Sequence, residues 1–214
     1  MSRSVVVTNA ATELARAIGA ELVRTGLHVS GQIEHAVRDF GCVDALVTCP
    51  TVPSGAAAEA LALDAFLAGI SSNLSDAFFD AQAAAAQMLA QACPHSTPSH
   101  RGCIVTITSV AGVLALPGHA TFCSAMAGLD VATRLLADEW RPSGIRVAAV
   151  GAGLSPELMA GVLPAGASSR RVPEPVSEEQ IAQAVCFLLS DAANGVAGST
   201  LYVDGGWLAD GYWE

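Results

Sequence analysis

The chain has 214 residues, a length that suits one domain. Apolar residues make up 52% and charged residues 14%, a balance that excludes an intrinsically disordered chain. The formal net charge of −10, with only 10 lysines and arginines together, argues against a surface that follows nucleic-acid phosphates. Because so few charges cover a monomer, we expect some apolar surface to be buried against another subunit.

Short β-branched segments alternate with amphipathic segments along the chain. We predict strands at 5–8, 27–29, 43–48, 103–108, 145–150 and 200–203. We predict helices at 11–25, 33–40, an alanine-rich stretch from about 58 to 92, 120–140 and 177–189. Residues 151–176 contain several glycines and prolines and are expected to be irregular. This alternation predicts an α/β fold, a doubly wound parallel sheet of the Rossmann-like kind, in a single domain over residues 1–214.

The cysteines and the chain start indicate a cytoplasmic setting. No apolar run is long enough for a membrane span, and residues 1–7 lead directly into a strand, so we expect no membrane association and no signal peptide. Six cysteines occur without any Cys-x-x-Cys pair. We therefore expect reduced, mostly buried thiols and no metal site.

Four segments resemble the short-chain dehydrogenase/reductase family. They are residues 102–112, 144–153, 181–189 and 198–206, which correspond to the family's strand ending in the catalytic serine, its strand before a Pro-Gly turn, its C-terminal helix and its closing strand. The resemblance spans almost the whole chain. It implies a Rossmann-like fold, an NAD(P) cofactor and a site built from Asn, Ser, Tyr and Lys.

The family's cofactor loop is not retained. Its pattern Thr-Gly-x-x-x-Gly-x-Gly corresponds to residues 8–15, where Asn9, Glu13 and Ala15 replace the three glycines. Those glycines let the backbone approach a pyrophosphate at a helix N-terminus. A Glu13 carboxylate about 4 Å from a phosphate would cost about 4 kcal/mol. The favoured alternative is that Glu13 is an ordinary acid in a first helical turn, where the helix dipole stabilises it. Both interpretations predict that this chain binds no cofactor.

The adenosine side of the family site is also altered. Residues 31–42 provide room for one short crossover helix, whereas the family places a helix, a strand and a second helix there. We therefore expect a truncated sheet that lacks the third strand and its flanking helices. Ser30 and Gly31 stand where an acid or arginine would contact the ribose. Residues 48–51 replace the family's Asn-Asn-Ala-Gly turn.

The family's catalytic residues are half retained. Asn73 and Ser109 match the asparagine and serine, whereas Phe122 and Met126 replace the tyrosine and lysine. In the family the tyrosine hydroxyl exchanges the proton and the lysine lowers its pKa. Because Phe122 and Met126 can do neither, we expect Asn73 and Ser109 to be vestigial and the chain to have no catalytic residues of the usual kind.

Other residues leave alternatives open. Ser109 could be a nucleophile with His119 as its base, or a hydroxyl bonded to nearby backbone. Asn73 could position water, or bond backbone and bend its helix. Arg170 and Arg171 could bind a phosphate or carboxylate, or be solvated surface charges. The tail, residues 212–214, could be disordered or dock on a neighbouring subunit.

The resemblance implies a role for the chain in an assembly. The family's two long helices form a four-helix subunit interface, and here they correspond to 58–92 and 120–140. We therefore expect a pseudoenzyme: a non-catalytic subunit in a heterotetramer with a complete short-chain dehydrogenase/reductase paralogue. NAD(P) would then lie on the partner subunit, and the complex would act on a hydroxyacyl or ketoacyl thioester such as an acyl-CoA. The alternatives are a cofactor-free enzyme, like the family's halohydrin dehalogenases, and a ligand-binding homo-oligomer.

Overall fold

A six-stranded parallel sheet organises the computed structural model, which describes residues 3–52, 55–94, 96–154 and 175–210. The strands are β1 (Ser4–Val7), β2 (His28–Ser30), β3 (Ala45–Thr48), β4 (Gly102–Ser109), β5 (Ile145–Ala152) and β6 (Thr200–Val203). Their spatial order is β2-β1-β3-β4-β5-β6, and every neighbouring pair is parallel. The predicted parallel, Rossmann-like α/β fold is therefore confirmed.

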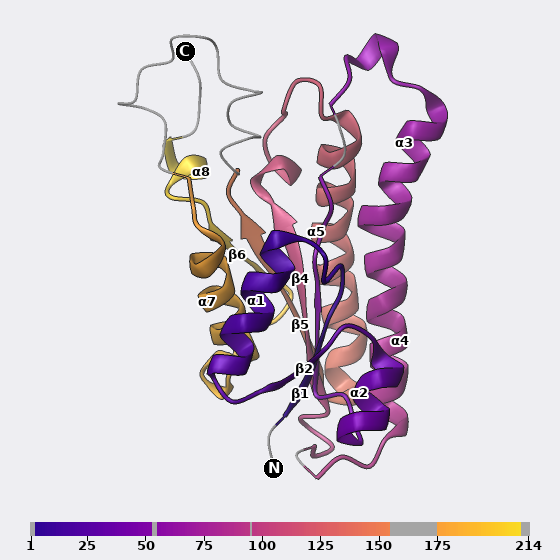
Figure 1. The fold of residues 1–214 in the computed structure, drawn as a ribbon, viewed down its shortest axis with the longest axis vertical. Helices are drawn as coiled ribbons and strands as arrows, with labels where there is room; N and C mark the ends of the chain where they lie inside the picture. Colours follow the sequence, from indigo (N-terminus) through magenta and orange to yellow (C-terminus); the bar gives the residue numbers. More distant parts are fainter. Residues whose placement is uncertain (1–2, 53–54, 95, 155–174, 211–214) are drawn as a thin grey trace.

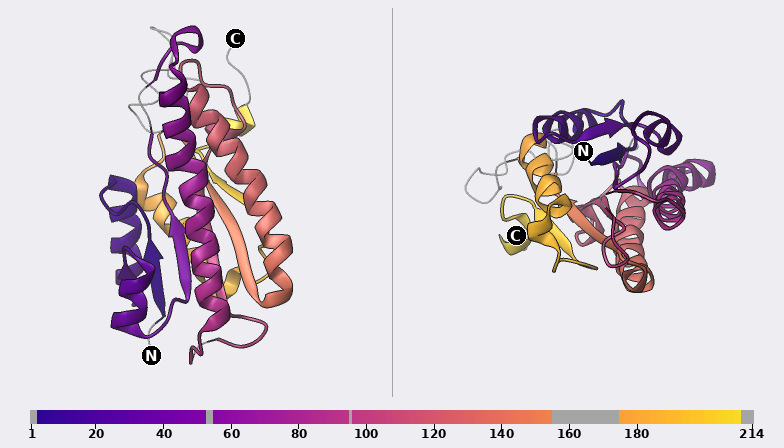
Figure 2. Two further views of the ribbon diagram at one scale, coloured as in Figure 1. Left: turned by 90° about the vertical axis from the view of Figure 1, so that its right-hand side faces the viewer. Right: turned by 90° about the horizontal axis from the view of Figure 1, so that it is seen from below.

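Helices cover both faces of the sheet (Figures 1 and 2). They are α1 (Glu13–Arg24), α2 (Ile33–Phe40), α3 (Leu63–Ile70), α4 (Asp76–Ala90), α5 (Ala120–Trp140), α7 (Glu178–Leu189) and the short α8 (Trp207–Asp210). Helices α1 and α7 pack together over one face, while α2, α4 and α5 cover the other. No helix among the described residues is both long and apolar enough to cross a bilayer.

The core follows from this double coverage. All four residues of β1 and all four of β3 are buried, and β4 is buried from its second residue onward. Side chains that alternate along each strand enter separate clusters on the two faces, Val5 with Leu22 and Val6 with Leu46. Strands buried on both faces require a continuous run of apolar residues, and such runs indicated these segments as strands in the sequence.

The alanine-rich stretch departs from its predicted boundaries. A short 3-10 turn occupies Ala58–Ala60, Leu61 and Ala62 are extended, and the continuous helix begins only at Leu63. Nothing in that 3-10 turn is buried. A short helix without packing is marginal whatever its alanine content, so the first turns are lost. A π-helical turn, Ser71–Ser75, then joins α3 to α4.

The chain reverses its winding direction between β1 and β3. The segment after β2 crosses through α2 and returns to β3 on the opposite side of β1. In open α/β sheets such a switch point, at the carboxyl ends of the strands, is where ligands usually bind. The loops that follow β1, β3 and β4 therefore define the place to look for a site.

The capping box at the start of α7 gives a first test of the fold. Ser177 caps Gln180 N–H, and the Gln180 side chain accepts the Ser177 N–H at 3.0 Å. We expect Ser177→Ala to lower the free energy of unfolding by about 1 kcal/mol and Ser177→Gly, the matched control, by only a few tenths. Urea unfolding followed by circular dichroism measures both. Equal losses in the two variants would contradict this assignment.

Candidate functional site

The loops after β1 and β3 are bonded to each other across the switch point. The Asn9 side-chain amide donates to the Cys49 carbonyl, and Cys49 N–H donates to Thr8 Oγ1 at 3.2 Å. Asn9 has a φ of +52°, a left-handed conformation that asparagine tolerates better than most residues. The position of the family's first glycine is thus occupied by a side chain that closes the two loops together.

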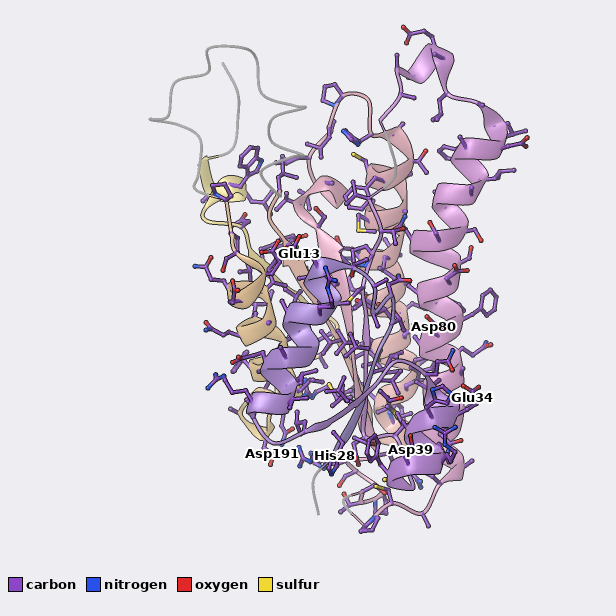
Figure 3. The ribbon with its side chains drawn as sticks, viewed as in Figure 1. Glu13, His28, Glu34, Asp39, Asp80 and Asp191 are labelled. Carbon is purple, nitrogen blue, oxygen red and sulfur yellow. The ribbon has the colours of Figure 1, made fainter. Side chains whose placement is uncertain are left out.

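The N-terminus of α1 satisfies part of its own hydrogen bonding. Thr12 Oγ1 accepts the Ala15 N–H at 3.2 Å and donates to the Asn9 carbonyl at 3.0 Å. Ala15 is 3% exposed and packs in the core beneath the loop. Glu13 is exposed at this end of α1, where Figure 3 labels it. A carboxylate therefore occupies the positive end of the helix dipole, where an anionic ligand would otherwise bind.

Asn73 is buried within the π-helical turn and bonds backbone on two sides. Its Oδ1 accepts the Thr51 N–H at 2.8 Å, and its Nδ2 donates to the Gly69 carbonyl at 3.1 Å. The side chain is 1% exposed. Asn73 thus ties the loop after β3 to the helical layer, and the extra residue of the π turn accommodates this bond.

Ser109, at the end of β4, also bonds backbone. Its hydroxyl donates to the Ala152 carbonyl at 3.2 Å and accepts the Ala111 N–H at 3.2 Å, which caps a short 3-10 turn. Its side chain makes no hydrogen bond to His119. The geometry therefore does not bring together the serine–histidine pair considered from the sequence.

The tyrosine and lysine positions of the family lie inside an apolar cluster. Phe122 is 2% exposed and Met126 is 0% exposed, one turn apart on α5. The cluster contains Val110, Ala111, Leu116, Phe122, Ala125, Met126, Leu154 and Trp207. Neither position faces solvent, and neither offers a proton donor or a charge.

Three buried polar atoms near this edge lack a hydrogen-bond partner among the described residues, and of their residues only Thr108 was not considered from the sequence. The atoms are Thr48 Oγ1, Thr108 Oγ1 and His119 Nδ1. Thr48 ends β3, where the family's Asn-Asn-Ala-Gly turn would start. The neighbouring Cys49 thiol is not an available nucleophile, because burial raises its pKa to about 12.

Two further candidates lie outside the described residues: the pair Arg170 and Arg171, and the tail at 212–214. The roles expected for them from the sequence stay predictions.

The candidate site therefore consists of the loop residues Asn9 and Thr12, the backbone-bonded Asn73 and Ser109, and the apolar positions that adjoin them.

Comparisons with known proteins agree on one family. A family model described as enoyl-(acyl carrier protein) reductase matches residues 3–208. The chain is 29% identical to a 2-(S)-hydroxypropyl-CoM dehydrogenase of Xanthobacter autotrophicus, over 97% of this chain and 82% of that protein. It is 32% identical to the 3-oxoacyl-acyl-carrier-protein reductase of Salmonella typhimurium, over 83% of this chain and 72% of that protein.

A solved structure gives the same result for the fold. The short-chain oxidoreductase of Burkholderia thailandensis superposes with a TM-score of 0.79 and 25% identity, over 98% of this chain and 94% of that one. Other curated relatives are matched over only 21% to 48% of their own length. Similarity of fold thus extends over the chain, while sequence similarity to several relatives is confined to part of them.

The burial of Met126 yields a second prediction. Met126→Lys restores the family's residue type at a fully buried position, and we expect the unpaired ammonium to lower the free energy of unfolding by about 3–5 kcal/mol. Met126→Leu, which keeps the volume apolar, should cost less than about 1.5 kcal/mol. Chemical denaturation measures the free energy of unfolding of both variants. A lysine variant as stable as the leucine variant would mean that the position opens to water.

Proposed function

Because this chain belongs to the short-chain dehydrogenase/reductase family, a family of oxidoreductases, we propose that it is a subunit of a heteromeric member of that family. In this proposal the chain carries out no hydride transfer and binds no dinucleotide. A complete paralogue in the same assembly supplies the catalytic residues and holds NAD(P). This chain contributes a rigid fold and a contact surface.

One observation carries the proposal. The two side chains that exchange and stabilise the proton in the family are replaced by Phe122 and Met126, and both are buried in an apolar cluster. A general acid must reach the proton that it transfers, within hydrogen-bond distance or through one water. Side chains without ionisable groups, packed away from solvent, support a chain whose chemistry is supplied by another subunit.

The switch point does not fit a dinucleotide. A pyrophosphate needs free N–H groups at the start of α1 and close backbone approach, which glycines allow. Here Asn9 bonds the loop after β3, Thr12 caps the helix, and the exposed Glu13 adds a negative charge. These features support the absence of a cofactor from this chain.

The connection between β2 and β3 also supports this proposal. Residues 31–42 form only α2 before the chain returns to β3. We propose that this is a shortened form of the family's adenosine-binding segment, with the third strand and its helices reduced to one crossover helix. The solved Burkholderia oxidoreductase is matched over 94% of its length, so the proposal concerns this local segment and not the extent of the fold.

The outer surface of α3, α4 and α5 supports assembly. Leu67, Phe79, Val131 and Leu135 are 54%, 59%, 56% and 50% exposed on these helices. Helices α4 and α5 lie side by side, and their outer faces form one side of the molecule (Figure 2). Exposed apolar groups that recur along two adjacent helices favour a protein contact over a monomer surface.

The substrate class is proposed by analogy with the relatives. Both the family model's description and the Salmonella relative's name refer to acyl groups carried by acyl carrier protein. We propose that the assembly acts on a hydroxyacyl or ketoacyl thioester, with the reaction on the partner subunit.

Affinity purification from the source organism tests the proposal. A tag on this chain should recover a tetramer whose second component is a complete short-chain dehydrogenase/reductase, identified by native mass and peptide sequencing. A tetramer of this chain alone would overturn the proposal. That outcome would favour a ligand-binding homo-oligomer or a cofactor-free enzyme.

The apolar surface gives a third prediction. Phe79→Asp should dissociate the assembly, because an aspartate would have to be desolvated in the contact. Val23→Asp, a matched control on α1 with the same 59% exposure, should leave the mass unchanged. Native mass spectrometry reads both variants. Retention of the full assembly by Phe79→Asp would place the contact elsewhere.

Cofactor binding gives a fourth prediction. Titration of the isolated chain with NADH or NADPH, followed by nicotinamide fluorescence, should show no saturable binding. The purified complex should bind one dinucleotide for each partner subunit. A stoichiometry that counts this chain as well would contradict the proposal.

A further inference from the structure

Two cysteines and an aspartate meet at the edge of the sheet opposite to the candidate site. Cys42 and Asp44 lie at the amino end of β3, and Cys93 lies in the loop after α4. The Cys93 Sγ is 3.1 Å from Asp44 Oδ1, and the Cys42 Sγ is 3.9 Å from Asp44 Oδ2. One ligand atom from each residue lies within 4.8 Å of the other two. The three side chains thus surround one point.

This cluster holds a carboxylate without a cationic partner. Asp44 is 9% exposed, and no arginine or histidine in the described part of the chain forms an ion pair with it. Its Oδ2 accepts the Ser4 N–H at 2.7 Å, the one backbone donor that it receives within the described part of the chain. A buried carboxylate is costly unless a cation or several donors stabilise it. The other donors to Asp44 are the Cys42 and Cys93 thiols, and a thiol is a weak donor, so the site favours a positive ion.

The donor atoms select the kind of ion. Two thiolates with one carboxylate form a borderline-soft set of the kind that binds Zn²⁺, whereas Mg²⁺ and Ca²⁺ require oxygen ligands. Tetrahedral Zn²⁺, with bonds of about 2.3 Å to sulfur and about 2.0 Å to oxygen, holds its ligand atoms about 3.5–3.8 Å apart. The two observed sulfur–oxygen separations, 3.1 Å to Asp44 Oδ1 and 3.9 Å to Asp44 Oδ2, lie on either side of the sulfur–oxygen value of about 3.5 Å.

We propose that Cys42, Asp44 and Cys93 form a Zn²⁺ site with water in the fourth position. On binding, each thiol loses its proton to solvent and its sulfur bonds to the ion, so two protons are released per Zn²⁺ and no electron is transferred. The proposal is independent of the function proposed above. It departs from the sequence, which led us to expect no metal.

Without the ion, the thiols hydrogen-bond to the carboxylate. In the metal-free chain, Cys93 donates to Asp44 Oδ1 and Cys42 donates to Asp44 Oδ2. A thiol that coordinates Zn²⁺ is deprotonated outright, so metal binding replaces these hydrogen bonds with bonds to the ion. The same side chains thus have two states, and the presence of the metal decides between them.

Solvent can reach the cluster from two sides. Cys93 lines a hollow of about 470 Å³ together with residues 96–98, and Asp44 lines a cavity of about 430 Å³ at the lower edge of the sheet. Asp191, labelled in Figure 3 at this lower edge, lines the same cavity. Arg101 lines both openings. An entry path for the ion is one of the features required of a metal site.

Cobalt substitution tests the proposal on the full chain. Co²⁺ added to the reduced protein should give a thiolate-to-cobalt charge-transfer band that saturates at one ion per chain and disappears when Zn²⁺ is added. Hydrogen-bonded thiols without a metal site give no such band. Absence of the band in the wild-type chain overturns the proposal whatever the variants do.

Variants assign the ligands. Cys93→Ser and Cys42→Ser should each lower the affinity for Zn²⁺ at least 100-fold, measured by competition with a chelator, while circular dichroism verifies folding. Cys186→Ser, a half-buried thiol on α7, is the matched control and should bind as the wild type does. Undiminished zinc affinity in a folded Cys93→Ser chain overturns the proposal. If neither variant folds, the intensity of the wild-type band decides, because two cobalt–sulfur bonds are required.

Discussion

Burial of the central strands on both faces is the constraint on which this structure depends. Strands β4 and β5 pair over eight residues, from Gly102 opposite Ile145 to Ser109 opposite Ala152. Their side chains point alternately to the two faces, and a helical layer covers each face. Such a sheet excludes water only if both layers are present, so the helices have to pack as closely as the strands do.

Helix α5 links this core to the candidate site. Thr133 on α5 shares a 2.7 Å hydrogen bond with Thr106 on β4, and Asp130 accepts the Thr200 hydroxyl of β6 at 2.9 Å. The same helix carries Phe122 and Met126 in its first two turns. Apolar residues at these positions extend the core along α5, so the loss of the family's tyrosine and lysine is compatible with a well-packed fold.

The outer face of that helical layer is the surface through which we propose that the chain contacts another subunit. The inner sides of α4 and α5 are buried against the sheet, whereas Phe79 and Val131 are more than half exposed. Because the helices are held rigidly from beneath, their outer faces present a fixed surface to a partner. An assembly role needs this rigidity and does not need an open cofactor crevice.

The sequence by itself determined the elements and the identities at the family's positions. Hydrophobic periodicity predicted α2 at its observed bounds, 33–40, and α5 at 120–140. The prediction succeeds because the buried face of a helix is set by the spacing of apolar residues within the helix itself. Local composition failed at 58–62, where alanine predicts a helix and only the absence of packing shows that none is stable. Their spacing relative to the family's motifs also identified Asn73 and Ser109, but it did not predict their hydrogen-bond partners.

Tertiary structure alone decided those partners. Asn73 bonds Thr51 across 22 residues, Ser109 bonds Ala152 across 43, and Cys93 meets Asp44 across 49. No periodic pattern connects residues at such separations. Strand register and helix packing bring them together, and these are set by burial summed over the whole sheet, whereas a sequence motif records only what lies within a few residues.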